Sequence, residues 1–372
     1  MSQNQVPTQR NKQIADMKQL VYTWHVLPVS AALVEVGVPQ IIPADGSGLD
    51  VAQIAQKANV DERLLFRYLH FVSSLGVFTE LPNRHFVHNE SSKLLLPGNS
   101  TFYLLLFWSN KGGMMTAAEY STQLRDPSKI AFEHAFKMPY WEYIGQTRGL
   151  EKLFADFMQV QSNEVMPDLL RTIELPDTGI VADVGGGYGH VLLEFLKAKP
   201  ELTGMVFELP IVAKQVELGL QDPNPQNDSI YSKYTFDVKK RMSVVVGNYN
   251  DNSQLKQIAN ADVFFFKWIF HDNSDAVCSK ILAGLYQIMK PTAKIIICEF
   301  VLKNKLNEWE KALTLDLLMG VTFDAKERTK NEWIKLLSNG EGYQYTVSFG
   351  DCTICPQIWE MELITLTKNA DH

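Results

Sequence analysis

The stretch Val181-Ala-Asp-Val-Gly-Gly-Gly-Tyr-Gly189 decides the fold, because an apolar strand-like run leads into it and an amphipathic helical pattern follows it. Glycines at such a junction let the backbone turn tightly and approach a ligand, and the next helix offers free N–H groups. A dinucleotide fingerprint counted from Gly185 needs a glycine at position 190, where His190 stands. With Asp183 at its head, the pattern D-x-G-x-G-x-G instead favours a nucleoside that carries an amino acid and a positive sulfonium.

Downstream of this stretch, apolar runs alternate with amphipathic helical segments, which predicts a parallel sheet with helices on both faces. The predicted strands are 180–184, 205–209, 244–247, 263–267 and 294–302, and the predicted helices are 189–199, 211–220 and 275–289. The second strand ends in Glu208, where a Rossmann-like site holds its ribose-binding carboxylate. A tight turn alone would also explain the glycines, but strand, glycines, helix and Glu208 together favour cofactor binding by Asp183, Gly185, Gly187 and Glu208.

The first 110 residues predict a mainly helical domain with a helix-turn-helix and a small wing. Asp50 and Asp61 are expected N-caps of two short helices, and a strand-turn-strand pattern follows over 77–88. A winged helix raises a DNA-binding hypothesis. Against it, Lys and Arg number eight over this segment, Asp and Glu also number eight, and the second helix is apolar around most of its circumference. We expect a subunit interface instead, extended by Phe102–Trp108.

The segment 111–175 has helical patterns, and we expect it to act as a hinge and as a wall of the substrate pocket. Loop breaks are predicted at Gly112-Gly113, Pro127 and Pro139. The predicted organisation is a dimerisation domain over 1–110, a helical linker over 111–175 and a catalytic domain over 176–372. Asp222–Arg241, rich in Pro and Asx residues, predicts a surface excursion whose Lys239-Lys-Arg241 run is solvated.

Composition bounds the function classes of this 372-residue chain. A net charge of −7, which lies entirely outside the neutral first 110 residues, disfavours binding to nucleic acid or anionic lipid. The longest apolar stretches, 103–108 and 261–270, are shorter than the roughly 20 residues of a membrane span. Four cysteines and an N-terminus without the pattern of a signal peptide predict a cytoplasmic protein without a membrane role. A lone Cys352-x-x-Cys355 pair predicts thiols rather than a metal site.

A second constellation follows the fourth predicted strand, at Lys267-Trp-Ile-Phe-His271-Asp272. Ligands of open α/β sheets bind at the carboxyl ends of strands, which is where His271 lies. Glu299 ends the next strand and Glu327 precedes a later helix, so both carboxylates are expected at the same edge. A His flanked by acids is held in one tautomer and has its pKa raised, as a general base for a hydroxyl requires. The alternative is that the His is structural and each Glu pairs with a surface Lys or Arg.

These motifs resemble the S-adenosylmethionine-dependent O-methyltransferases of the caffeate and hydroxyindole type. The likeness spans nearly the whole chain; it rests on 183–189, Phe207-Glu-Leu-Pro210, 267–272, Glu299 and Lys326-Glu-Arg-Thr329, with Phe132-Glu-His and Met138–Tyr143 upstream. The resemblance implies an α/β fold with a mostly parallel seven-stranded Rossmann-like sheet and an N-terminal winged-helix dimerisation domain. It also implies S-adenosylmethionine as cofactor, a small hydroxylated aromatic acceptor, a homodimer and no metal.

The resemblance further assigns roles to individual residues. His271 would be the base, oriented by Glu299 and Glu327. The residues that would surround the cofactor are Gly185, Gly187, Glu208, Asn248, Tyr249 and Lys267. Those that would shape the acceptor pocket are Phe154, Met158, Gln161, Phe270, Met319 and Phe323.

The sequence departs from the family pattern at three places, and these departures concern the identity of the acceptor more than the methyl-transfer reaction. Asn248 stands where an Asp is usual, Asn273 stands where a Trp is common, and the excursion over 222–241 is long. Two other functions stay open beside methyl transfer. One is a non-methylating reaction in the same pocket, such as a pericyclic or decarboxylating step, and the other is a cofactor-sensing DNA-binding regulator.

Overall fold

The computed structural model describes residues 9–222, 229–306, 308, 310–350, 353–355 and 360–369. The chain divides into two compact units, Met1–Met115 with Gly149–Val160 and Thr116–Arg148 with Gln161–His372. This division differs from the predicted boundaries at 110 and 175, because 116–148 packs with the second unit and 149–160 with the first. The long helix α12 (Leu150–Thr172) contributes residues to both units.

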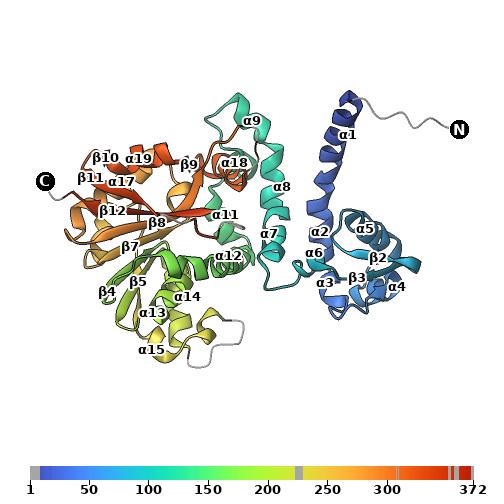
Figure 1. Ribbon diagram of the computed structural model, residues 1–372, viewed down its shortest axis with the longest axis horizontal. Helices are drawn as coiled ribbons and strands as arrows, with labels where there is room; N and C mark the ends of the chain where they lie inside the picture. The colour runs from blue at the N-terminus through green and yellow to red at the C-terminus, as the bar shows by residue number, and fades with distance from the viewer. Residues whose placement is uncertain are drawn as a thin grey trace. The chain divides into compact units, whose positions relative to one another are not determined.

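The first unit is mainly helical and holds a three-stranded antiparallel sheet in the order β1-β3-β2 (Figure 1). Its helices are α1 (Gln9–Tyr22), η1 (Thr23–His25), α2 (Val26–Glu35), α3 (Val38–Ile41), α4 (Val51–Ala58), α5 (Glu62–Ser74), η2 (Pro82–Arg84), α6 (Glu90–Lys93), α7 (Ser100–Ser109) and the start of α8 (Lys111–Ala118). Its strands are β1 (Leu49–Asp50), β2 (Thr79–Leu81) and β3 (His85–Val87). Two helices followed by a short hairpin is the order that the sequence predicts.

Capping side chains set where these helices begin. Asp50 forms a capping box with Gln53 at the start of α4, and the Asp61 carboxylate accepts two backbone N–H groups of α5. Both predicted N-caps are therefore confirmed. The predicted break at Gly112-Gly113 is wrong, because both glycines lie inside α8. The chain breaks one turn earlier, at Asn110, whose side-chain oxygen accepts the Gly112 N–H at 2.6 Å and the Gly113 N–H at 3.3 Å.

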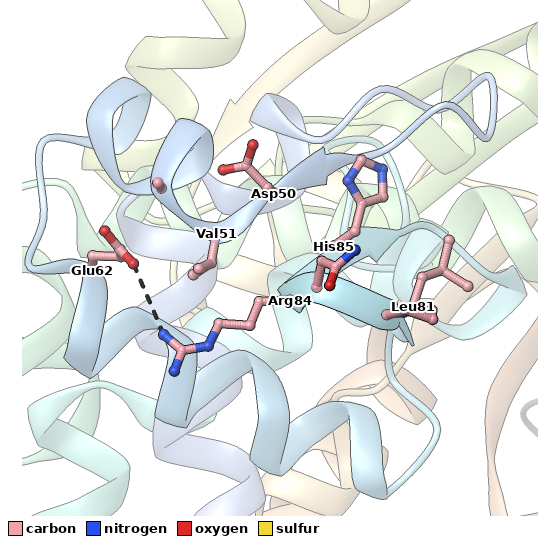
Figure 2. A pocket seen from close by; sticks show the side chains of 9 residues that line it. Asp50, Val51, Glu62, Leu81, Arg84 and His85 are labelled. Carbon is pink, nitrogen blue, oxygen red and sulfur yellow. Dashed lines mark ion pairs between the residues drawn. The ribbon is translucent and has the colours of Figure 1, made fainter.

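A groove of about 620 Å³ lies beside the hairpin of the first unit, and Figure 2 shows the side chains that line it. Among its lining residues are the carboxylates of Asp50 and Glu62 and the guanidinium of Arg84, which lies 4.0 Å from Glu62. The guanidinium is also 4.4 Å from the centre of the Phe66 ring. Two carboxylates against one guanidinium disfavour a phosphate backbone in this groove, in line with the neutral charge of the segment.

The second unit is built on a mixed sheet in the order β10-β11-β12-β8-β7-β4-β5-β6, with β9 paired to β8. The seven longer strands in the described part of the chain are β4 (Gly179–Val184), β5 (Leu202–Glu208), β6 (Met242–Val246), β7 (Val263–Lys267), β8 (Lys294–Leu302), β11 (Tyr343–Phe349) and β12 (Met361–Lys368); β9 (Arg328–Thr329) and β10 (Asn339–Gly340) are short. Strands β4 to β8 run parallel, whereas β11 and β12 are antiparallel to their neighbours. The predicted α/β, mostly parallel seven-stranded fold is confirmed.

Helices cover both faces of this sheet, as Figure 1 shows. Among the helices of the second unit are α9 (Tyr120–Arg125), α10 (Ala131–Phe136), α11 (Tyr140–Gln146), α13 (His190–Ala198), α14 (Pro210–Gln221), α16 (Asn252–Leu255), η4 (Lys256–Ile258), η5 (Phe270–Asp272), α17 (Asp275–Ile288), α18 (Lys311–Phe323) and α19 (Lys330–Ser338). On β7, Phe264 and Phe266 pack with α17 and α19 on one face, and Phe265 meets Phe195 of α13 on the other, with ring centroids 5.1 Å apart. A strand buried on both faces reads as a continuous apolar run, as β7 does. No helix in the described part of the chain combines the length and the apolar character needed to cross a bilayer.

The predicted excursion at Asp222–Arg241 lies partly outside the described residues, since 223–228 are not among them. Its described part forms η3 (Ile230–Lys233) and α15 (Phe236–Lys239). The Tyr231 hydroxyl donates to the Tyr188 carbonyl at 2.9 Å, so this segment packs against the glycine loop. Arg241 corrects the prediction of a solvated run. Its guanidinium donates to four backbone carbonyls, those of Leu196, Lys199, Leu202 and Asp237.

Candidate functional site

The carboxyl ends of β4, β5, β7 and β8 bring most of the predicted site residues to one edge of the sheet. Asp183 lies near the end of β4, Glu208 ends β5, Lys267 ends β7 and Glu299 lies in β8. In the register of the sheet, Asp183 pairs with Phe265 of β7, and Lys267 pairs with Cys298, the neighbour of Glu299. Parallel neighbours end side by side, so the two constellations predicted separately belong to one site.

The glycine loop leaves room for a ligand beside its backbone. Gly185 and Gly187 have φ of +70° and +57°, values that favour glycine over residues with a side chain. A Cβ on Gly185 would overlap the Ile269 side chain, whereas a Cβ on Gly187 would meet nothing within 4 Å. The Gly187 N–H donates to Glu208 Oε1 at 2.9 Å, which ties the loop to the end of β5. A small open space therefore lies beside Gly187, next to the Glu208 carboxylate.

Asp183 and Glu208 place two carboxyl groups in this part of the site, and a nearby positive charge would stabilise both of them in their ionised form. Burial raises the pKa of Asp183 to about 7, with Lys267 opposing the rise and Glu208 adding to it. Burial also raises the pKa of Glu208 to about 7, against the stabilising backbone N–H groups of Leu209 and Gly187. Burial lowers the pKa of Lys267 to about 8, although Cys298, Asp183 and Glu299 oppose that change. Asp183 Oδ2 is buried and has no hydrogen-bond partner among the described residues, so a ligand would relieve it.

The next candidates along this edge, Asn248 and Tyr249, differ in their surroundings. Asn248 is exposed, and its side-chain oxygen accepts the Asn250 N–H at 2.9 Å. Tyr249 packs near the Gly185 backbone, and burial together with the charge of Asp272 raises the pKa of its hydroxyl. Tyr249 is thus placed between the glycine loop and the loop that carries His271, while Asn248 already uses its oxygen locally.

The loop after β7 is held in an unusual backbone conformation. Trp268 has φ of +57°, which is rare for a bulky residue and marks a turn that surrounding contacts must hold in place. Glu299 Oε1 accepts the N–H groups of Ile269 and Phe270 at 2.9 Å each, and it thereby fixes the start of η5. These contacts orient the following residue, His271, toward the edge of the sheet.

His271 is surrounded by three carboxyl groups. Its Nδ1 lies 2.7 Å from Glu327 Oε1 and 3.8 Å from Glu299 Oε2, and its Nε2 lies 3.4 Å from Asp272 Oδ1. The short contact is a hydrogen bond in which Nδ1–H donates to Glu327, and the other ring nitrogen, Nε2, faces Asp272. Burial opposes a charge on the imidazole, but the fields of Glu299, Glu327 and Asp272 outweigh it and raise the pKa of His271 to about 10.

The pKa values of the carboxyl groups in this cluster are shifted as well. Burial raises the pKa of Glu299 to about 7 and that of Asp272 to about 6, in both cases against the opposing charge of His271. Ligand atoms of His271, Glu299 and Glu327 lie within 4.8 Å of one another, a spacing that a metal ion can also use. His271 Nδ1 and Glu299 Oε1 are engaged in the hydrogen bonds above, whereas Glu299 Oε2 and Glu327 Oε2 are buried without a hydrogen-bond partner among the described residues. The absence of a metal stays a prediction, and Cys352 of the Cys-x-x-Cys pair lies outside the described residues.

Aromatic side chains from α11 and α18 pack together within the second unit. Phe323 lies edge-on to Tyr140 at 4.9 Å between ring centroids and stacks on Trp141 at 5.6 Å. Burial and the nearby charge of Asp272 raise the pKa of Tyr140 well above its usual value, so this group extends toward the His271 cluster. Met319, on the same helix as Phe323, is buried.

The other residues that the sequence predicts in the acceptor pocket have different surroundings from one another. Phe270 is fully buried against Phe266 and Trp333, which gives it a position in the core that the sequence did not predict. Gln161 is buried in the second unit, while Phe154 and Met158 belong to the first. Phe154 lies 5.6 Å from the Phe107 ring. The pocket roles of these residues stay predictions.

For three residues near His271 the sequence predicts no role of their own. Asp272 stands beside His271 in the quoted motif, Tyr140 lies within the quoted Met138–Tyr143 segment, and Arg328 follows Glu327. The motif signal contained all three. Nothing in the sequence indicated that Arg328 is fully buried or that Tyr140 approaches Asp272.

Comparison with known proteins agrees with this geometry. The chain matches the family model of the O-methyltransferase domain over residues 117–344. O-methyltransferase 12 of Dictyostelium discoideum is 29% identical over 220 residues, which cover 59% of this chain but only 53% of that protein. A (R,S)-reticuline 7-O-methyltransferase of Papaver somniferum is 27% identical over 345 residues, which cover 84% of this chain and 87% of that protein.

Comparison with solved structures shows a likeness in overall fold. The crystal structure of human N-acetylserotonin methyltransferase in complex with S-adenosylmethionine superposes with a TM-score of 0.78 at 18% sequence identity and covers 100% of both chains. Likeness at that identity concerns the fold alone. The family model, by contrast, spans more than half of the sequence and includes the glycine loop, His271, Glu299 and Glu327. This chain belongs to the O-methyltransferase family.

Proposed function

We propose that this protein is an S-adenosylmethionine-dependent enzyme that methylates a hydroxyl of a small aromatic acceptor, with His271 as general base. The observation that carries the proposal is the 2.7 Å contact between His271 Nδ1 and Glu327 Oε1, at the sheet edge that also holds the glycine loop. Glu299 and Glu327 would orient the base. Phenolic, indolic and polyketide-like acceptors all fit this chemistry.

The residues of the glycine loop suit the proposed cofactor. S-adenosylmethionine would supply an electrophilic methyl group on a positively charged sulfur. Glu208, at the end of β5, would bind the ribose hydroxyls, and the open space beside Gly187 admits a nucleoside next to the backbone. The unpartnered Oδ2 of Asp183 and the raised pKa values of Asp183 and Glu208 favour a ligand with positive charge and hydrogen-bond donors. Lys267, Asn248 and Tyr249 would complete the wall.

Proton removal is where this chain would help the reaction most. A phenol has a pKa near 10 and is mostly protonated at neutral pH. Because the pKa of His271 is raised to about 10, transfer of the phenolic proton to Nε2 would be close to balanced in free energy. Glu327 would stabilise the resulting imidazolium through Nδ1–H, while Glu299 holds the loop through the Ile269 and Phe270 N–H groups.

An aromatic acceptor is favoured by the side chains near the base. Phe323, Tyr140 and Trp141 form an aromatic group beside Asp272, and flat rings pack well against such surfaces. Met319 and Gln161 would contribute to the same wall. The poppy relative is a reticuline O-methyltransferase and the human structural relative an N-acetylserotonin methyltransferase, both named for aromatic compounds.

Replacing His271 tests the base directly. We expect His271→Ala to lower kcat on any accepted phenol by about 100- to 10,000-fold, because no other neutral base stands at Nε2. S-adenosylmethionine binding, measured by calorimetry, should change little. The product should be heavier than the acceptor by one methyl group for hydrogen. Unchanged turnover in the variant would remove His271 as base, and a product without added methyl would favour the non-methylating alternative.

The pH profile should report the carboxylates around the base. The base acts in its neutral form, so kcat/KM should rise with pH through the neutral range, about tenfold per unit below the pKa of His271. Glu327→Gln removes one negative charge and should move this rising limb about 1 to 2 pH units lower, in addition to lowering the maximum rate. Initial rates between pH 6 and 10 measure both effects. A limb that stays in place would contradict control of His271 by Glu327.

Cofactor affinity should depend on the ionisation of Asp183. The pKa of Asp183 is raised to about 7, so binding of a positive ligand should weaken as pH falls from 8 to 6. Asp183→Asn should raise the Kd of S-adenosylmethionine at pH 8 about 10-fold or more and reduce its pH dependence. Asp177→Asn is the matched control, because Asp177 is exposed and pairs with Lys199. An unchanged pH dependence in Asp183→Asn would exclude Asp183 as the titrating group.

A homodimer through the first unit is proposed from the exposed apolar side chains of its N-terminal helices. Met17 is 60% exposed, Leu20 68%, and Trp24 55%. Large apolar side chains in such a group are typical of surfaces covered by a partner. The first unit also lacks a basic excess, so a second copy of the chain explains this surface better than DNA does.

Size-exclusion chromatography with light scattering tests the dimer. We expect the wild-type protein at about twice the mass of 42.2 kDa, and the double variant Met17→Glu/Leu20→Glu at the mass of one chain, since buried charges are costly. Lys18→Glu, on the same helix, should remain a dimer. A wild-type monomer, or a double variant that stays dimeric, would contradict the proposed interface. A salt-sensitive complex with DNA would instead favour the regulator alternative.

A further inference from the structure

Arg328 is a fully buried guanidinium that grips the loop carrying His271. Its Nη1 donates to the Phe270 carbonyl and its Nη2 to the Asn273 carbonyl, each at 2.9 Å. Its Nε donates to Asp275 Oδ1, also at 2.9 Å. The group faces the Trp333 ring at 5.1 Å from the ring centre. Burying a guanidinium is costly unless its donors are satisfied. Here they meet a carboxylate and three backbone carbonyls, the third being that of Lys326 at 3.4 Å from Nη1.

The two carbonyls that Arg328 binds at 2.9 Å flank the pair His271-Asp272. Phe270 precedes the pair and Asn273 follows it, so the guanidinium spans the loop from one side of the base to the other. The same loop is held at its start by Glu299, which accepts the Ile269 and Phe270 N–H groups. The backbone of this short turn is thus fixed by a carboxylate on its N–H groups and by a guanidinium on its carbonyls.

Arg328 and Glu327 are neighbours in the chain, so the residue that binds the His271 imidazole is adjacent to the residue that binds the loop carrying His271. Strand β9 pairs with β8 through Val301↔Arg328, which anchors the segment to the sheet. From that anchor, Glu327 reaches His271 Nδ1 and Arg328 reaches the carbonyls around His271. One segment therefore supplies both the partner of the imidazole and the clamp on the imidazole's own backbone.

We propose that Arg328 is a positioning residue that holds the His271 loop against Glu327 and thereby sets the orientation and proton affinity of the base. The inference rests on the proposed function only in treating His271 as the base. Without the clamp, the loop would shift relative to Glu327, and the hydrogen bond that aligns the imidazole would lengthen. Arg328 touches neither of the imidazole nitrogens, so it acts through the backbone.

The direction of the change in the pKa of His271 separates this role from a purely electrostatic one. The other charged or titratable groups that pack around the loop include Glu299 of β8, Lys267 of β7, Tyr140 of α11, Tyr249 after β6, Asp316 of α18, Asp275 and Cys278 of α17, and Glu327 and Asp272 beside the base. Removing a nearby positive charge alone would raise the pKa of His271, because the imidazolium would lose a repelling neighbour. Loosening the contact with Glu327 would lower it.

The experiment compares Arg328→Met and Arg328→Lys with a matched control. Arg241→Met is that control, because the Arg241 guanidinium also donates to backbone carbonyls, those of Leu196, Lys199, Leu202 and Asp237, near the start of β5 rather than at its carboxyl end. The pKa of His271 is measured by NMR titration of ¹⁵N-histidine-labelled full-length protein, with His271→Ala to assign the signal. Thermal unfolding and S-adenosylmethionine binding are followed in parallel.

We expect both Arg328 variants to lower the pKa of His271 by about one unit and kcat by about 10- to 100-fold, with the KM for the acceptor changed less than kcat. Arg328→Lys retains the charge but not the fork, so it should resemble Arg328→Met. Arg241→Met should lose thermal stability while the pKa of His271 and kcat stay within about twofold of wild type.

Two results would overturn the positioning role. One is an unchanged or raised pKa of His271 in a folded Arg328 variant, and the other is an equal fall of that pKa in Arg241→Met. If Arg328→Met does not fold, Arg328→Lys, which keeps the positive charge, decides by the same titration. The titration needs no acceptor and no turnover, so it still tests Arg328 if methyl transfer itself is disproved.

Discussion

Three carboxyl groups and one imidazole form a buried cluster at the edge of the sheet. The surrounding structure depends on this cluster, because its buried charges need hydrogen-bond partners and opposite charges. A buried charge without partners is strongly unfavourable. Here Glu299 receives two backbone N–H groups, and Glu327 receives the proton of His271 Nδ1. The loop that supplies these donors is strained at Trp268, whose φ is +57°. Such a loop persists only if its neighbours hold it, which explains why its carbonyls are held as well.

The parallel sheet is what allows this compensation. Lys267 of β7 lies beside Cys298 of β8, so the chain leaving β7 turns directly over Glu299. With helices packed on both faces, β7 and β8 have little freedom to shift, and the spacing between loop and carboxylate is fixed by the sheet. The glycine loop after β4 uses the same edge. Beside this loop the pKa values of Asp183, in β4, and of Glu208, at the end of β5, are raised by burial, whereas the acids around His271 raise the pKa of the imidazole.

Particular residues show why some elements were predictable and others were not. The run Val263–Lys267 is apolar throughout and was predicted with the bounds it has, because a strand buried on both faces leaves that pattern. Strand β5 begins at Leu202, before its predicted start at 205, since Gly204 obscures the pattern; in the fold Gly204 makes room for the Leu192 side chain. Gly112 and Gly113 suggested a break but lie inside a helix. There the missing side chain of Gly113 leaves room for the Trp108 carbonyl, a constraint that arises only from packing.

The sequence by itself determined the α/β class, the glycine loop, the helix caps at Asp50 and Asp61, and the set of acids and histidine at strand ends, because periodicity, turn chemistry and capping are local properties. It also carried the family likeness that the comparisons confirm. Only the tertiary structure decided that Nδ1 of His271 faces Glu327, that Tyr140 approaches Asp272 and that Arg328 lies buried against two carbonyls. These relations join residues up to 132 positions apart, from Tyr140 to Asp272, and long-range contacts of side chains leave no periodic trace in a single sequence.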